Sequence, residues 1–198
     1  MVALIKPPAL PASMTAEEFY ALNPGGAEPW QLVDGEPQAM SPASPDHGAL
    51  QGELGRVIGN ALRAAGSRCR LVVAPGVMPR LDATHNIRVP DLAVTCTDPA
   101  IEGAWLTSPV LVAEILSPSN RRETWTNVWA YTTIPSLQEI LVLGSEDIWA
   151  KVLRRTPDGA WPLEPETVMD GDLVLDSIGL RTDLADLYRD TRLRRPAG

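Results

Sequence analysis

The sequence predicts a mixed β-sheet flanked by helices, an α/β architecture with antiparallel hairpins. Residues 110–116 form the most continuously apolar strand pattern of the chain, which is typical of a central strand. A long amphipathic helix pattern precedes the strands at residues 45–65, and a second helix pattern follows the central strand at residues 121–133. A chain of 198 residues can bury one substantial core, so we expect a single domain over residues 14–190.

The N-terminal region predicts an arm, a short helix and a hairpin. Residues 1–13 contain several prolines and predict an irregular arm. Thr15 and Glu18 form a capping-box pattern, which predicts the start of a short helix. Residues 30–40 then predict two strands joined by a tight turn at Asp34-Gly35.

The long helix has a clear start and a clear apolar face. Ser44 is a suitable N-cap and Pro45 suits the first helical position. His47 heads the apolar face, where a histidine usually packs or caps the helix. A role in a functional site is the other interpretation, because helix N-termini favour anions. The apolar face comprises Leu50, Leu54, Val57, Ile58, Ala61 and Leu62.

Strand patterns occupy most of the remaining chain. They cover residues 69–74, 77–81, 87–96, 110–116, 137–143 and 148–154. A returning strand starts at Trp161, and another strand covers residues 173–175. Residues 183–189 predict a short terminal helix, and residues 191–198 predict a frayed tail.

Charge and cysteine content limit the function classes. The formal net charge of −8 excludes a generic nucleic-acid coat, but not an enzyme whose contact with a polyanion is local and bridged by a metal. Cys69 and Cys96 lie in strand patterns without zinc-like spacing, so we expect two reduced core thiols and a cytoplasmic protein. The apolar patch at the N-terminus is broken by prolines and indicates neither a signal peptide nor a membrane span.

Two acids interrupt strand patterns that are otherwise apolar. Asp91 opens the apolar run at residues 92–94, and Glu114 lies inside the run at residues 110–116. A buried acid is costly without a partner, so such acids normally meet a cation or strong hydrogen bonds. Each acid could cap a strand end or pair with an arginine such as Arg88, which is the favoured interpretation for Asp91 alone. For the two acids together, a shared divalent metal is the favoured interpretation.

Each of the two acids lies inside a short motif, and the two motifs occur in a fixed order along the chain. Residues 89–94 read Val-Pro-Asp-Leu-Ala-Val, and residues 111–119 read Leu-Val-Ala-Glu-Ile-Leu-Ser-Pro-Ser. These motifs resemble the Uma2 family, a branch of the PD-(D/E)XK nuclease superfamily with a restriction-endonuclease-like fold. Supporting pieces are the hairpin at residues 32–36, the helix entrance at residues 41–47, and Tyr131 followed by residues 134–137.

The resemblance implies a metal-dependent endonuclease that hydrolyses phosphodiester bonds of nucleic acid. It implies Mg²⁺, or Mn²⁺, held by the carboxylates of Asp91 and Glu114 and by the carbonyl of Ile115. Such a metal would activate a water and neutralise charge on the scissile phosphate. The resemblance also implies that His47 faces the same cleft.

Three positions depart from the pattern of the resembling family. The superfamily lysine two places after the second acid is Leu116 here. In this branch a lysine normally lies on the following helix, where this chain has Asn127, and the acid one turn earlier is Glu123. The glutamate usual in the first hairpin strand corresponds to Gln31. Asn127 can orient a water but cannot carry positive charge.

Two hypotheses follow from the missing lysine. The first is a metal-dependent nuclease in which Asn127 or His47 helps to position water. Arg121 or Arg122 could replace the lysine electrostatically, or could simply face solvent in the first helical turn. The second is a catalytically degenerate relative that acts as a binding or dimerisation module. The first hypothesis would be favoured if four side chains converged on one solvent-accessible cleft. These side chains are Gln31, Asp91, Glu114 and Asn127.

A homodimer is a further prediction, based on tryptophan content. Trp125, Trp129 and Trp149 lie on elements that are already rich in apolar residues. Aromatic side chains are favoured in the core of protein interfaces. Alternatively, these rings fill the core of the monomer.

Overall fold

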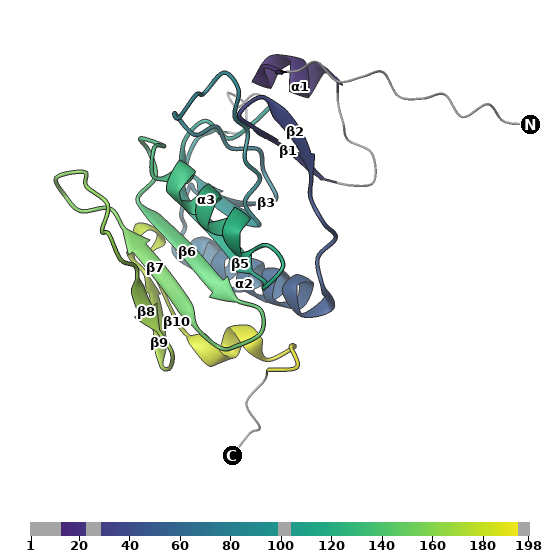
Figure 1. The fold of residues 1–198 in the computed structure, drawn as a ribbon. Coiled ribbons are helices and arrows are strands. Elements are labelled where there is room, and N and C mark those ends of the chain that lie inside the picture. The colour runs from purple at the N-terminus through teal and green to yellow at the C-terminus, as the bar shows by residue number, and fades with distance from the viewer. Residues whose placement is uncertain (1–12, 23–28, 99–103, 194–198) are drawn as a thin grey trace, which may run out of the picture.

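A six-stranded mixed sheet forms the centre of the structure (Figure 1). The structure is a computed structural model that describes residues 13–22, 29–98 and 104–193. The strands are β3 (Arg70–Val73), β4 (Leu92–Thr95), β5 (Pro109–Leu116), β6 (Glu139–Gly144), β7 (Ala150–Arg154) and β8 (Glu166–Val168), in the order β3-β4-β5-β6-β7-β8. β5 and β6 pair in parallel, whereas the other neighbours are antiparallel. The predicted fold class and the central place of the strand after residue 109 are confirmed.

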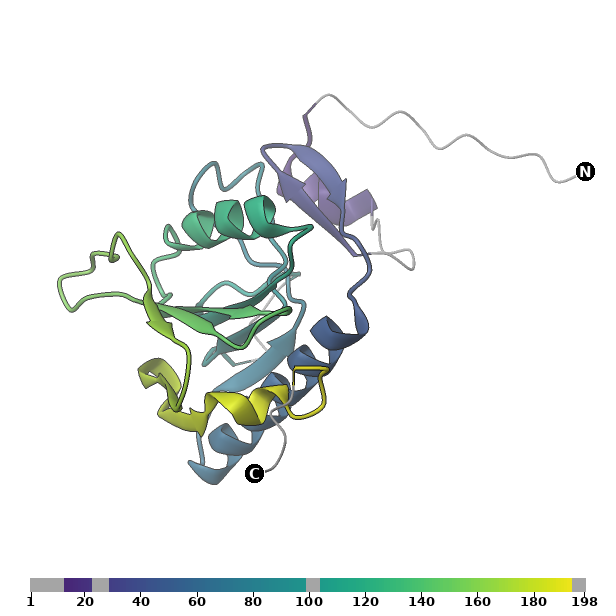
Figure 2. The same cartoon turned by 60° about the horizontal axis from the view of Figure 1, so that its bottom comes forward.

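Helices cover the two faces of this sheet (Figure 2). Helix α2 (Pro45–Ala64) lies on one face together with the 3₁₀ helix η3 (Leu184–Tyr188), and α3 (Arg121–Tyr131) lies on the other. Along β5, side chains alternate between the two cores: Ile115 enters the core under α2, and Val112 and Leu116 enter the core under α3. By the same alternation, Glu114 points to the α3 face.

Helix α2 forms as the sequence predicts. The Ser44 hydroxyl accepts a hydrogen bond from the His47 backbone N–H at 3.2 Å, and Pro45 occupies the first turn. The apolar face is buried against the sheet, and Leu54 is fully inaccessible to solvent. Gly66 follows the helix with φ of +59°, a left-handed conformation that glycine adopts without steric cost.

A smaller unit at the N-terminal side packs on the edge of the main fold. It contains α1 (Ala16–Leu22) and the hairpin of β1 (Trp30–Val33) and β2 (Glu36–Ala39). The predicted capping box is confirmed: the Thr15 N–H donates to the Glu18 carboxylate at 2.8 Å, and the Glu18 N–H donates to the Thr15 hydroxyl at 3.2 Å. An isolated bridge between Leu32 and Ile87 connects β1 to the segment that leads to Asp91.

Prolines shorten several predicted strands. The strand predicted at residues 77–81 is wrong, because Val77 makes only isolated bridges. Within the strand predicted at residues 87–96, Pro90 cannot donate to a ladder, and only β4 is regular strand. The strand predicted to return at Trp161 begins later, at β8, after two further prolines.

The C-terminal part differs most from the sequence prediction. β9 (Asp172–Leu175) and β10 (Leu180–Asp183) form a second hairpin around the short 3₁₀ helix η2 (Asp176–Ile178), and β10 was not predicted. The terminal helix is the 3₁₀ helix η3. The frayed-tail prediction is wrong for residues 191–193, because the Arg192 N–H donates to the Asp46 carboxylate at 3.0 Å and Leu193 packs against the core. Residues 1–12 and 194–198 lie outside the described residues, and the division into domain, arm and tail stays a prediction.

Cys69 and Cys96 form a disulfide, so the prediction of two free thiols is wrong. Arg70 pairs with Thr95 in the antiparallel β3–β4 ladder, and the two cysteines are therefore the next residues along that ladder. The sequence did not reveal that these two strand patterns are neighbours. Among the described residues, the helices are all too short or too polar to span a bilayer.

Candidate active site

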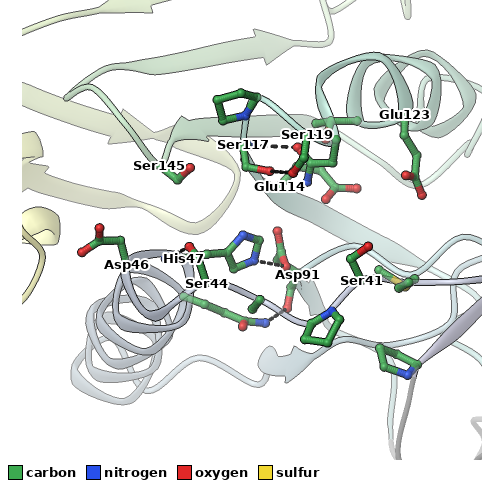
Figure 3. Close-up of a pocket in the computed structure, with 18 of the residues that line it drawn as sticks. Ser41, Ser44, Asp46, His47, Asp91, Glu114, Ser117, Ser119, Glu123 and Ser145 are labelled. Carbon is green, nitrogen blue, oxygen red and sulfur yellow. Dashed lines mark hydrogen bonds and ion pairs between the residues drawn. The ribbon is translucent and has the colours of Figure 1, made fainter.

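A cleft of about 830 Å³, lined by charged and hydroxyl side chains among prolines and small apolar residues, lies between the first turn of α2, the start of α3 and one end of the sheet. Its walls include Asp46 and His47 from α2, and the loop at residues 117–120 that leads into α3 (Figure 3). Asp91 and Glu114 lie on the sheet side of this cleft. Two helix starts and two strand ends therefore meet at one place.

The two acids that the sequence singled out are neighbours in the sheet. Leu92 on β4 pairs with Ala113 on β5, so that Asp91 lies opposite Glu114 in the antiparallel register. The Ile115 backbone N–H donates to Asp91 Oδ2 at 2.7 Å and ties the first acid to the strand of the second. Their juxtaposition follows from strand pairing, which local sequence does not reveal.

His47 belongs to the same arrangement. Its Nε2 lies 2.8 Å from Asp91 Oδ1, and the ring is almost completely buried (Figure 3). The Gln51 side-chain amide, one turn later on α2, donates to the Asp91 carbonyl at 2.8 Å. The structure places the His47 ring in the cleft beside Asp91, and its role in a functional site stays a prediction. Arg88 forms no ion pair with Asp91; burial lowers its pKa, and Asp34 and Glu123 are the acids whose charges oppose this shift.

Glu114 is a buried acid with one strong hydrogen bond. The Tyr131 hydroxyl donates to Glu114 Oε1 at 2.7 Å, and Glu114 is only 7% exposed. Burial raises the pKa of Glu114 well above 4.5, and the nearby Asp91 carboxylate raises it further, while the Tyr131 hydrogen bond opposes this shift. Burial and the adjacent Glu114 also raise the pKa of Tyr131. Without a cation, burial and the neighbouring Asp91 carboxylate therefore disfavour the ionised form of Glu114.

Gln31 and Asn127, two of the three residues that depart from the family pattern, are in contact with each other. The Asn127 side-chain amide donates to Gln31 Oε1 at 3.4 Å, and the Gln31 amide donates to Glu123 Oε1 at 2.5 Å. Glu123 and Asn127 line the cleft, whereas Gln31 is completely buried beside it. Asn127 Oδ1 is buried and has no hydrogen-bond partner within the described parts of the chain.

Tyr131 and Gln51 contact the two acids, and the motifs alone do not assign either residue to the site. Tyr131 belongs to a family motif, and its position one turn after Asn127 places both residues on one face of α3. Gln51 carried no signal beyond lying four residues after His47. Arg121 and Arg122 are exposed and do not line the cleft, so neither takes the place of the missing lysine inside it.

The donor set suits Mg²⁺ better than a metal that requires a complete protein cage. Among the described residues, His, Cys, Asp and Glu side chains do not gather in threes at metal-binding distance. Mg²⁺ is usually held by one or two carboxylates, with waters and substrate phosphates as its other ligands. Asp91 and Glu114 provide two hard oxygen donors, and the Ile115 carbonyl lies on the same strand. The residues present therefore fit the divalent cation that the sequence suggested.

The fold is shared with a known structure. A crystal structure described as a "putative nuclease belonging to DUF820" from Anabaena variabilis superposes with a TM-score of 0.72, covering 88% of this chain and 97% of the other at 20% identity. At this identity the likeness establishes the fold, which is a restriction-endonuclease-like mixed α/β fold.

The family is established by the sequence match. A model of the Uma2 family, described as "Putative restriction endonuclease", matches residues 16–185. The chain therefore belongs to the Uma2 family, as the motifs around Asp91 and Glu114 predicted. Curated proteins gave no match to this chain.

Proposed function

We propose that this chain is a metal-dependent nuclease whose Mg²⁺, or Mn²⁺, is held by Asp91, Glu114 and the carbonyl of Ile115. The observation that carries the proposal is the pair of facing carboxylates, one of them buried, at the wall of this cleft. Burial and the facing Asp91 carboxylate make an ionised Glu114 costly unless a cation lies between the two acids. A nuclease family match makes nucleic acid the natural substrate.

The protein's own contribution is the positioning of the two acids. A bound divalent cation would polarise the scissile phosphate and lower the pKa of a coordinated water. Asp91 is held from two sides, by the His47 ring and by the Ile115 N–H, so its carboxylate cannot rotate freely. Because an ionised Asp91 accepts hydrogen bonds, His47 must carry a proton on Nε2 for this contact. Tyr131 holds Glu114 in the same way.

Glu123 and Asn127 are the remaining candidates for handling water. They lie one turn apart on α3 and line the same cleft as the two acids. In this proposal Asn127 orients a water through its side-chain amide. Glu123 contributes a third carboxylate, which accepts a hydrogen bond from the Gln31 amide. Neither residue supplies positive charge, so the metal alone must offset the charge that develops on the phosphate.

The test is metal binding followed by cleavage. Isothermal calorimetry should detect binding of Mg²⁺ or Mn²⁺, and the metal should raise the free energy of unfolding by about 2.7 kcal/mol at a hundredfold excess over Kd. Asp91→Asn and Glu114→Gln should each remove most of this effect, because hard cations need charged oxygens. Glu146→Gln, which changes an exposed acid at the rim of the same cleft, is the matched control and should retain it.

The alternative function is that of a degenerate relative that binds a partner without catalysis. The neutral pair of Gln31 and Asn127, in place of charged residues, favours this alternative. Absence of divalent-metal binding to the unmodified protein would decide for it and against the nuclease.

The homodimer and the cytoplasmic location are part of the proposal as well. Trp125 and Trp149 pack against the core under α3, and Trp129, at 45% exposure, is the ring available for an interface. A monomer mass in light scattering at micromolar concentration would remove the dimer. Free thiols were the argument for a cytoplasmic location, and this argument is lost because the two cysteines are bonded to each other.

A further inference from the structure

The cleft carries an excess of negative charge. Its charged lining residues other than His47 are five acids and one arginine: Asp46, Asp91, Glu114, Glu123, Glu146 and Arg192. The arginine is already engaged, because Arg192 Nε lies 3.0 Å from Asp46 Oδ2 and its Nη2 lies 3.4 Å from Glu146 Oε1. A divalent cation on Asp91 and Glu114 would offset those two acids, but would leave the other acids in place.

Basic side chains are scarce around this cleft. The sequence contains only two lysines, Lys6 and Lys151, and Lys151 is the second residue of β7. Many arginines of the described chain form ion pairs away from the cleft, among them Arg56, Arg154, Arg181 and Arg189. Arg121 and Arg122 are the exposed cations nearest in sequence to the cleft wall, directly after its lining residue Asn120. Among the described residues, Arg121 and Arg122 are therefore the two exposed cations that adjoin the cleft wall without an ion pair, whereas Arg63, Arg68 and Arg80 are exposed on other segments.

The other polar groups of the cleft wall are neutral. They are mainly hydroxyls, from Ser41, Ser44, Ser117, Ser119, Thr124 and Ser145 (Figure 3). Hydroxyl groups can donate hydrogen bonds to one or two phosphates, but they do not neutralise a long row of phosphate charges. Duplex DNA brings one negative charge per about 1.7 Å of its axis. A cleft with this wall repels a duplex more strongly than it repels a short strand.

The size of the cleft also favours a short strand over a duplex. Its volume of about 830 Å³ lies within the range of pockets that enclose small ligands, about 300–1,000 Å³. A short flexible strand can place one phosphodiester at the paired acids and leave its other phosphates in solvent. A rigid duplex would bring many phosphates against Asp46 and Glu146 at the rim.

We infer that the substrate of this cleft is a short single-stranded oligonucleotide rather than a duplex. The inference rests on the proposed nuclease function and narrows its substrate class. In the reaction, the oxygen of a water forms a bond to phosphorus and the bond from phosphorus to one sugar oxygen breaks. That sugar oxygen takes up a proton, so the products are a phosphate monoester and an alcohol.

The experiment compares three probes at saturating Mg²⁺ or Mn²⁺: a DNA strand of four nucleotides, an RNA strand of four nucleotides, and a DNA duplex of about twenty base pairs. The value of kcat/KM per phosphodiester should be higher on a single strand by about tenfold or more, because a cleft of one charge sign changes encounter rates on this scale. Raising the monovalent salt fourfold should weaken single-strand binding by less than about sevenfold, since at most two phosphate contacts give a slope near 1.4 in log Kd against log salt.

A pair of charge-reversal variants isolates the role of the cleft. Glu146→Lys at the rim should improve duplex binding and steepen its salt dependence. Glu164→Lys makes the same change of net charge at an exposed position that does not line the cleft, and should have no such effect. Equal behaviour of the two variants would mean that charge in the cleft does not select the substrate, and would overturn the inference.

The remaining outcomes separate this inference from the proposed function. Efficient duplex cleavage, with the salt dependence of six or more phosphate contacts, would overturn the inference and leave the nuclease proposal standing. Failure to bind or cut any of the probes, although metal binds, would overturn both. Metal-dependent cleavage of the single strands, with the duplex spared, would support both.

Discussion

Gln31 and Asn127 should behave as one unit when they are changed to the charged residues usual in the family. Gln31→Glu and Asn127→Lys would each introduce a charge at a buried position, since Gln31 is 0% and Asn127 5% exposed. The two side chains are hydrogen-bonded to each other at 3.4 Å. Introduced together, the carboxylate and the ammonium could compensate each other. In each single variant, the new charge faces a neutral amide across the contact between positions 31 and 127.

The expected free energies follow from these contacts. Gln31→Glu removes the donor of the 2.5 Å hydrogen bond to Glu123 and places a second carboxylate against it, which should cost about 3–5 kcal/mol as an uncompensated buried charge. Asn127→Lys should cost less, about 1–3 kcal/mol, because the Gln31 and Glu123 oxygens lie nearby. For side chains in contact, a coupling energy near the upper end of 0.5–3 kcal/mol is expected, about 2–3 kcal/mol in favour of the double variant.

Urea denaturation of the unmodified protein, the two single variants and the double variant measures this coupling. If the two losses of stability add to within about 0.5 kcal/mol, the residues are independent and the reasoning is refuted. The same four proteins give a second readout under the proposed nuclease function. Metal-dependent cleavage should rise with Asn127→Lys and rise further in the double variant. If Asn127→Lys alone raised the cleavage rate as much as the double variant does, the two positions would not act as a pair.

Three further outcomes are expected. Leu54→Ala should lower the free energy of unfolding by about 2–5 kcal/mol, because Leu54 is fully buried under the sheet; a near-neutral urea midpoint would contradict the packing of α2. With a chelator present to remove divalent metal, the free energy of unfolding should fall as pH rises above 4.5 through the raised pKa of Glu114, because the folded protein keeps a proton on Glu114 that the unfolded chain has lost. Glu114→Gln should flatten this dependence of stability on pH. An unchanged dependence in the variant would assign the titration to another group. Reduction of the disulfide between Cys69 and Cys96, 27 residues apart in sequence, should cost about 3–4 kcal/mol in guanidinium titrations, whereas a Cys69→Ser, Cys96→Ser double variant should not respond to reductant.

Local signals in the sequence were sufficient for the elements that begin or end with a strong cap or a continuous apolar run. Ser44 and Pro45 predicted the first turn of α2, and the Thr15–Glu18 capping box predicted α1. The central position of β5 followed from its apolar run. These features are decided within a few residues, because caps, turns and helical periodicity depend on neighbours along the chain.

The sequence was misleading where backbone donors are missing or pairing is weak. Residues 77–81 have strand-like side chains, yet Pro79 removes a ladder donor and only isolated bridges form around Val77. β10 follows a short 3₁₀ turn at Asp176–Ile178 and carries Arg181 and Asp183, so it lacks the apolar alternation that marks a strand. Its pairing with β9 is what makes it a strand.

The candidate site was predicted residue by residue but not as a geometry. The motifs named Asp91, Glu114 and His47, and the family resemblance implied that they share a cleft, but neither gave their contacts. The structure brings them together through the β4–β5 register and the direction of α2, which join segments more than twenty residues apart. The contact of Gln31 with Asn127 and the disulfide between β3 and β4 are likewise decided by packing. Such contacts depend on which strands become neighbours, and that is settled by the burial of the whole apolar surface rather than by any local stretch of chain.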